Sequence, residues 1–188
     1  SISIHRLAPQ DYHRFHSPID CTVVGTRCIN GELWTVNPVA VNAVDVFTEN
    51  KRNVVYLRSP IYGTVAYINV GAHMVGSILY TGPQGPMGPD SSLLQPGQRL
   101  RKGEDMGYFK FGGSTVICLW EKDRIRFDPD LAKRSEESTE ILVRMGETLG
   151  TPGPQAVDKA PTAMPFGMDQ EEAAMARTPP TLLPNYTS

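Results

Sequence analysis

The residues best suited to chemistry form a short run, Gly112, Gly113, Ser114 and Thr115, between two apolar segments. Two adjacent glycines weaken a strand and leave room for a neighbouring hydroxyl to approach the Gly113 carbonyl. Attack of the Ser114 hydroxyl on that carbonyl would move the acyl group from nitrogen to oxygen. Elimination would then release Gly113 as a carboxylate and leave dehydroalanine, which hydrolyses to a pyruvoyl group with loss of ammonia.

The same run also fits a β-bulge or a tight turn, and from these residues alone that interpretation comes first. A turn leaves the chain uncut. Self-cleavage would instead yield fragments 1–113 and 114–188, which denaturing electrophoresis separates.

Two histidines, His13 and His16, are the next candidates. Imidazole takes up and returns protons near neutral pH, so each could act as a general acid or base. The pair could equally be two packed or surface histidines, or half of a metal site. No Cys-x-x-Cys pair accompanies them, so we expect no metal.

A mainly β domain must position these side chains. From Ile2 to about Asp128, β-branched and aromatic residues form short runs separated by Gly, Pro and Asn. A helical pattern is present only in Asp130–Leu149, which predicts a short amphipathic helix that caps the sheets. The expected strands are Ile2–Leu7, Thr22–Ile29, Asn53–Leu57, Gly63–Val70, Gly76–Tyr80, Met106–Phe111, Thr115–Trp120 and Ile125–Phe127.

Composition divides the chain into a body, residues 1–150, and a tail, residues 151–188. The tail holds seven of the 16 prolines and few β-branched residues, so we expect it to be largely disordered. The Gly- and Pro-rich segment Thr81–Asp90 predicts an exposed loop. The near balance of 18 basic and 20 acidic residues gives no reason to expect a nucleic-acid partner.

The remaining sequence features bear on the cellular setting. Cys21, Cys28 and Cys118 follow no metal-ligand spacing and are interpreted as reduced packing thiols. No run of about 18 apolar residues could span a bilayer. The chain starts at Ser1 without Met, so we expect that an upstream part is missing.

Two segments indicate how the sheets are arranged. Arg58–Val65 and Leu94–Gly107 resemble the strand opening and hairpin of lipoyl- and biotinyl-type domains, without their carrier lysine. The resemblance implies a two-sheet sandwich of the barrel-sandwich hybrid type.

Longer motifs, spread from Ile4 to Gly150, resemble the phosphatidylserine decarboxylase family. They are collinear with the family's blocks, and several are long. They are L-A-P-Q-D-Y-H-R-F-H-S-P-I-D at Leu7–Asp20, T-V-N-P at Thr35–Pro38, F-T-E-N-K-R at Phe47–Arg52, G-A-H-M-V-G-S-I at Gly71–Ile78 and K-G-E-D-M-G-Y-F-K-F-G-G-S-T at Lys102–Thr115.

The resemblance assigns roles to the candidates. It implies cleavage between Gly113 and Ser114, with Ser114 becoming a covalent pyruvoyl group that forms a Schiff base with the substrate amine. His16 matches the family's base for self-cleavage, and His13 matches the acid or base of decarboxylation. The aspartate that completes the family's Asp-His-Ser triad precedes Leu7, outside this chain. His73 is more simply interpreted as a packed histidine.

The resemblance also implies a substrate and a setting. Phosphatidylserine would become phosphatidylethanolamine at a membrane surface, by an intracellular enzyme of mitochondria or endomembranes. The two cleaved fragments would stay together, and a homodimer is left open. A soluble pyruvoyl-dependent decarboxylase of a free amino acid such as tryptophan is the alternative, and a non-catalytic lipoyl-like scaffold is a further one.

Overall fold

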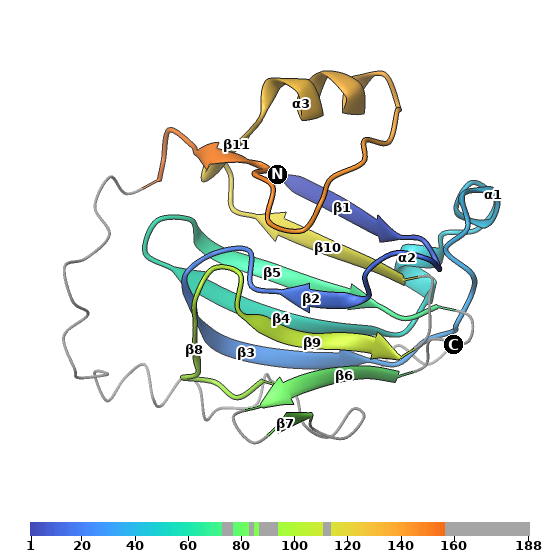
Figure 1. Ribbon diagram of the computed structural model, residues 1–188, viewed down its shortest axis with the longest axis horizontal. Coiled ribbons are helices and arrows are strands. Elements are labelled where there is room, and N and C mark those ends of the chain that lie inside the picture. The colour runs from blue at the N-terminus through green and yellow to red at the C-terminus, as the bar shows by residue number, and fades with distance from the viewer. Residues whose placement is uncertain (73–76, 83–84, 87–93, 111–113, 157–188) are drawn as a thin grey trace, which may run out of the picture.

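Two β-sheets form the framework of the computed structural model, which describes residues 1–72, 77–82, 85–86, 94–110 and 114–156 (Figure 1). The larger sheet has the strand order β1-β10-β5-β4-β3-β8, and the smaller has the order β2-β9-β6-β7. Strands β11 and β12 form a separate pair. The mainly β, two-sheet architecture expected from the sequence is thereby confirmed. The strands are β1 (Ile2–Leu7), β2 (Arg14–His16), β3 (Cys21–Ile29), β4 (Arg52–Ser59), β5 (Gly63–Val70), β6 (Ser77–Gly82), β7 (Gly85–Pro86), β8 (Arg99–Leu100), β9 (Asp105–Lys110), β10 (Ser114–Trp120), β11 (Ile125–Phe127) and β12 (Gly150–Pro152).

The core lies between the two sheets because alternate side chains of each strand point inward. Val65 and Tyr67 of β5 belong to the core cluster, as do the alternating residues Val116 and Cys118 of β10. From the smaller sheet, Phe15 lies at the centre of an aromatic group. Its ring is 5.2 Å from Phe109, 5.5 Å from Tyr80 and 6.3 Å from Tyr67, measured between centroids.

The expected strands match the observed ones closely. Ile2–Leu7, Gly63–Val70 and Ile125–Phe127 are reproduced residue for residue, and the other expected strands differ by one or two residues at one or both ends. The expected end residues Gly76 and Phe111 lie outside the described residues. Strand β2 was not expected, because a three-residue strand carries too few alternations to stand out.

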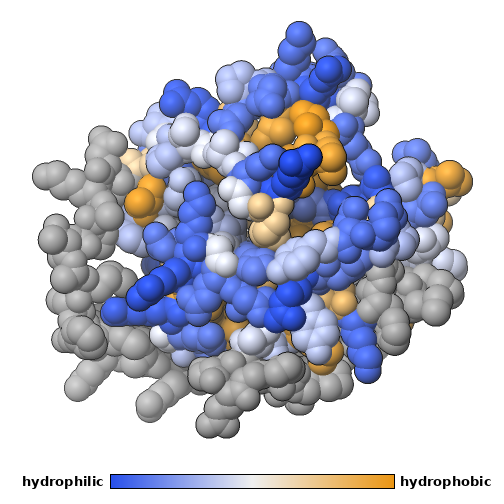
Figure 2. Space-filling model, in the orientation of Figure 1, coloured by the Kyte–Doolittle hydropathy of each residue, from blue (hydrophilic) through white to orange (hydrophobic). Residues whose placement is uncertain are grey.

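The C-terminal helix is shorter than the sequence predicted. Helix α3 (Pro129–Glu136) ends seven residues into the expected range, and Ser138 takes a φ of 54°, which a right-handed helix cannot include. Ile141, Leu142 and Met145, which were expected on the helix, instead lie beyond α3 in a segment without helix or strand, where Leu142 is 83% exposed. Figure 2 shows apolar side chains gathered beside α3 at the top of the molecule.

Two short helices, α1 (Pro38–Val41) and α2 (Val46–Glu49), lie between β3 and β4. The Asn37 side chain caps α1 by accepting a hydrogen bond from the Val39 backbone N–H at 2.9 Å. Both helices project from the end of the sandwich at the right of Figure 1.

The folded body runs slightly beyond the boundary expected at Gly150. Strand β12 pairs with β11, and the Gln155 N–H donates to the Asp123 carbonyl at 3.0 Å. Residues 157–188 lie outside the described residues, so the expected disorder of the tail stays a prediction. The expected loop Thr81–Asp90 is described only in part, where β6 pairs with β7.

Candidate active site

The candidate site is centred on Ser114, the first residue of β10. Ser114 lies opposite Leu7 of β1 and is 0% exposed. Because side chains alternate along a strand, Ser114 shares the core face with Val116 and Cys118. Gly112 and Gly113 lie outside the described residues.

The hydroxyl of Ser114 is an orphaned buried group. Among the residues that the structure describes, its Oγ has no hydrogen-bond partner, and neither has Oγ1 of Thr115. A buried hydroxyl without a partner costs about 1–3 kcal/mol, so such groups are uncommon without a functional reason. This observation fits a serine that is consumed when a pyruvoyl group forms.

His13 lies at the same end of the sandwich as Ser114. The His13 carbonyl accepts a hydrogen bond from the Phe109 N–H at 2.9 Å. The His13 backbone therefore lies beside the end of β9, whose last residue is Lys110. Ser114 follows Lys110 by four positions in the chain, and His13 is half-buried.

The ring of His16 is occupied on both sides. Nδ1 is 2.8 Å from the Gly103 carbonyl oxygen, which can only accept, so Nδ1 carries the proton. Nε2 is 2.8 Å from the Tyr12 hydroxyl and accepts its hydrogen when the ring is neutral. Tyr12 also stacks on the ring, with 5.7 Å between centroids.

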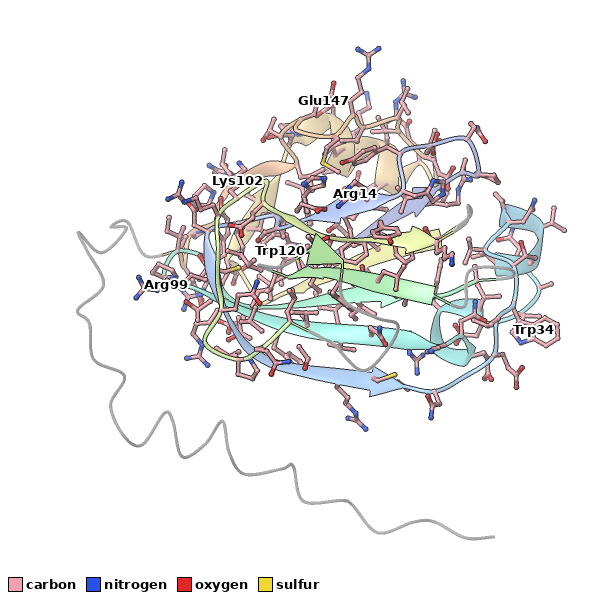
Figure 3. The ribbon with its side chains drawn as sticks, turned by 60° about the horizontal axis from the view of Figure 1, so that its bottom comes forward. Arg14, Trp34, Arg99, Lys102, Trp120 and Glu147 are labelled. Atoms are coloured by element: carbon pink, nitrogen blue, oxygen red, sulfur yellow. The ribbon has the colours of Figure 1, made fainter. Side chains whose placement is uncertain are left out.

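The structure does not bring His16 to Ser114. His16 pairs with Asp105 at the start of β9, whereas Ser114 follows the end of that strand. The rise of about 3.4 Å per residue puts roughly 17 Å of strand between Asp105 and Lys110. Figure 3 shows Lys102, the neighbour of the Gly103 that His16 contacts, on the opposite side of the molecule from Trp34, which is hydrogen-bonded to Asn50.

An ion pair fixes strand β2 on β9. The Arg14 guanidinium donates two hydrogen bonds to the Asp105 carboxylate, with Nε 3.1 Å from Oδ1. It also lies over the Tyr108 ring. Partial burial alone would raise the pKa of Asp105, but hydrogen bonds from Arg14 and Thr81 hold it below its usual value. The pair is partly solvent-exposed, so its role is chiefly to set the register.

Asn50, which the sequence did not single out, ties α2 to the Ser114 end. Its Nδ2 donates to the carbonyls of Trp34 at 2.7 Å and Gly71 at 2.8 Å, and its Oδ1 accepts from the Trp34 N–H at 2.8 Å. Gly71 follows Val70, the partner of Thr115. The sequence offered one signal of this role, which is that Asn50 lies inside the F-T-E-N-K-R motif.

Burial favours the uncharged forms of two ionisable side chains near this face. Burial lowers the pKa of His5, which lies opposite Val116. Burial raises the pKa of Cys118 to about 12. All three cysteines are free, as expected, but Cys28 is exposed and does not pack.

A cavity elsewhere among the described residues lies apart from Ser114. A cavity of about 250 Å³ is lined only by residues between Asp128 and Thr148, none of them from β9 or β10. Across the described ranges, no group of three or more His, Cys, Asp or Glu side chains could hold a metal ion. Nor does any helix in those ranges have the length and apolarity needed to cross a membrane. His73 lies outside the described residues.

Comparison with known proteins identifies the family. The family model described as phosphatidylserine decarboxylase matches residues 1–151. The chain is 49% identical over 152 residues to phosphatidylserine decarboxylase proenzyme 2 of Oryza sativa subsp. japonica, covering 80% of this chain and 22% of the relative. It is 45% identical over 151 residues to proenzyme 2 of Saccharomyces cerevisiae, covering 80% of this chain and 12% of the relative.

A bacterial relative matches equally well. The chain is 46% identical over 151 residues to the phosphatidylserine decarboxylase proenzyme of Chlamydia pneumoniae, which covers 80% of this chain. It spans 46% of that relative, and thus less than half the length of each of the three. The chain belongs to the phosphatidylserine decarboxylase family.

Proposed function

We propose that this chain carries the catalytic domain, residues 1–150, of an enzyme that decarboxylates phosphatidylserine to phosphatidylethanolamine. The observation that supports the proposal most is the buried, orphaned Ser114 hydroxyl at the start of β10, directly after two glycines, in a member of this family.

The prosthetic group would come from the chain itself. Ser114 attacks the Gly113 carbonyl, the chain divides into fragments 1–113 and 114–188, and position 114 becomes the pyruvoyl group. When formed, that group supplies an electron-withdrawing carbonyl next to the substrate's α-carbon. Strand β10 holds position 114 against Leu7 on one side and, through Thr115, against Val70 on the other.

Burial would protect this chemistry from water. The surrounding face is formed by Val116, Cys118 and the aromatic group around Phe15, all buried. Hydrogen bonds and charges act more strongly where water is excluded. A negative charge that develops at residue 114 would therefore be stabilised by a few fixed protein groups and not by water.

The proton-transfer roles are proposed for the two histidines. His13, at the Ser114 end, would return a proton to the substrate's α-carbon after loss of carbon dioxide. The family places the base for self-cleavage at the position of His16. For His16 to act on Ser114 its ring would have to move, because hydrogen bonds with Tyr12 and Gly103 hold the ring near the end of β9 that is far from Ser114.

The partners follow from the substrate. Phosphatidylserine resides in a bilayer, so we propose that the enzyme works at an intracellular membrane surface. The two fragments would remain associated, since β10 of the second fragment pairs with β1 and β5 of the first. We keep a homodimer as an open part of the proposal.

Substitution of the serine tests the proposal. Ser114→Ala removes the attacking oxygen and should leave one uncut chain without decarboxylase activity, while Ser59→Ala, another buried serine, should cut normally. Denaturing electrophoresis and release of labelled carbon dioxide measure both properties. Cleavage of the Ser114→Ala chain at Gly113 would refute the mechanism.

A further inference from the structure

Two asparagines, Asn53 and Asn69, lie side by side on the core face of the larger sheet. They are direct partners in the register of β4 and β5, and both are 0% exposed. Side chains directly opposite in antiparallel strands have Cβ atoms about 4.5–5.5 Å apart. We call these two side chains the amide pair.

Most hydrogen-bonding capacity of the amide pair is unused. Both polar atoms of Asn53 and the Oδ1 of Asn69 lack a hydrogen-bond partner among the described residues. Asn69 Nδ2 donates a hydrogen bond to the Tyr80 hydroxyl at 3.0 Å, across the two sheets. Buried polar groups are nearly always partnered, so orphaned ones require an explanation.

A structural role does not supply that explanation for Asn53. Asn50, three residues earlier and also 0% exposed, uses both of its polar atoms to join Trp34 and Gly71. Asn53 joins nothing in the described part of the chain. A leucine of similar size would fit the same place without desolvating an amide.

The amide pair adjoins Ser114. Asn69 pairs with Val116 on β10, and Ser114 lies two residues before Val116 on the same face. Diagonal neighbours in an antiparallel pair are about 7–8 Å apart, within reach of a small group bound at residue 114. Orphaned polar atoms of three residues thus gather at this end of the core.

The chemistry of the pair restricts its ligand. It offers N–H donors from Asn53 and carbonyl acceptors from both residues, with no charge of its own. A phosphate would find too few donors, and a metal ion would find only two neutral oxygens. A group that carries both a donor and an acceptor with no net charge matches the pair.

We propose that the amide pair binds the α-amino and α-carboxylate groups of the serine headgroup beside residue 114. Asn53 Nδ2 donates to the carboxylate, and Asn69 Oδ1 accepts from the ammonium group. Both contacts are hydrogen bonds to a charged group, which are stronger than hydrogen bonds between neutral groups. Exclusion of water from the core strengthens them further. The inference rests on the proposed function, since it names how that substrate is recognised.

Binding to an uncut chain tests the inference without any decarboxylation. The full chain with Ser114→Ala would be titrated by calorimetry with glycerophospho-L-serine, which has the headgroup but no acyl chains. Glycerophosphoethanolamine, which lacks the carboxylate, is the matched ligand. Asn53→Leu in this background should weaken binding of the serine ligand at least tenfold and leave the weaker ethanolamine binding unchanged, whereas Asn69→Leu, which removes the acceptor for the ammonium group, should weaken binding of both ligands.

Stability provides the second measurement. Asn53→Leu removes orphaned atoms, so its urea midpoint should equal or exceed that of the parent, and Asn53→Ala serves if leucine does not fit. Ser59→Ala, on the same face of β4, should change neither ligand's affinity. Equal serine-ligand affinity in parent and variants, no binding by the parent, or a lower midpoint for both Asn53 variants would overturn the inference.

The two proposals fail separately. A wild-type chain that cleaves and decarboxylates while the leucine variants bind normally would remove the inference alone. Loss of serine-ligand binding in these variants, together with a wild-type chain that never cleaves, would remove the proposed function and leave the binding site in place.

Discussion

Replacement of Asn50 by leucine should destabilise the chain more than any other single asparagine change. The substitution leaves three backbone groups without their partner: the Gly71 carbonyl in the interior, and the N–H and carbonyl of Trp34 in a part-buried setting. A buried orphan costs about 2 kcal/mol, and the two part-buried groups cost about 1 kcal/mol each. The leucine offsets about 1 kcal/mol by its apolar surface.

The expected loss is therefore about 3 kcal/mol, a large part of the roughly 5–15 kcal/mol that stabilises a typical domain. Urea titration followed by the fluorescence of the two tryptophans measures it, since one of them, Trp34, belongs to the anchored segment. Asn37→Leu is the matched control, because that exposed side chain makes a single capping bond worth about 1 kcal/mol. A loss below about 1 kcal/mol for Asn50→Leu would refute the reasoning.

Three further predictions concern the catalytic end and the core. His16→Ala should accumulate uncut chain, whereas His13→Ala should cut but lose turnover by about 10²-fold; the reverse pattern on gels and in activity assays would exchange the two roles. Gly107→Ala should cost about 3 kcal/mol or more, because an added Cβ would lie 2.1 Å from the Leu79 carbonyl oxygen. In urea titrations Gly25→Ala, whose Cβ would meet only Tyr56 at 3.6 Å, should cost far less, and equal losses would contradict the argument. Burial lowers the pKa of His5, so the unfolded chain takes up its proton first. Stability should be complete above about pH 6.5 and decline as pH falls toward the lower folded pKa. His5→Leu should flatten this part of the urea-midpoint profile, and an unchanged slope would exclude His5 as the cause.

The sequence predicted the parts of the fold that local pattern determines. Gly63–Val70 alternates in and out of the core, so its bounds could be stated in advance. The expected helix over Asp130–Leu149 was wrong beyond Glu136, because apolar spacing does not reveal that Ser138 adopts a left-handed conformation. Strand β2 was not predicted because it has only three residues, although His16 belongs to it and His13 directly precedes it.

The polar interior could not be predicted. Asn50, Asn53 and Asn69 look alike in the sequence, yet one is fully bonded and the other two keep orphaned atoms. Which face of a strand an asparagine occupies, and what lies opposite, depends on pairing between distant segments. The same reason separates His13 from His16, since only the register with β9 shows that they lie toward opposite ends of that strand.

The mass and N-terminus of the fragment that begins at residue 114 test the central claim most directly. We expect a fragment lighter by one ammonia than the same peptide with a serine, resistant to Edman sequencing and reactive with phenylhydrazine. Reduction with cyanoborohydride in the presence of phosphatidylserine should add the mass of the lipid to this fragment alone, and free tryptophan should add nothing. Labelling by tryptophan and not by lipid would point to an amino-acid decarboxylase. An unmodified serine at position 114 in an active enzyme would show that activity does not depend on a pyruvoyl group.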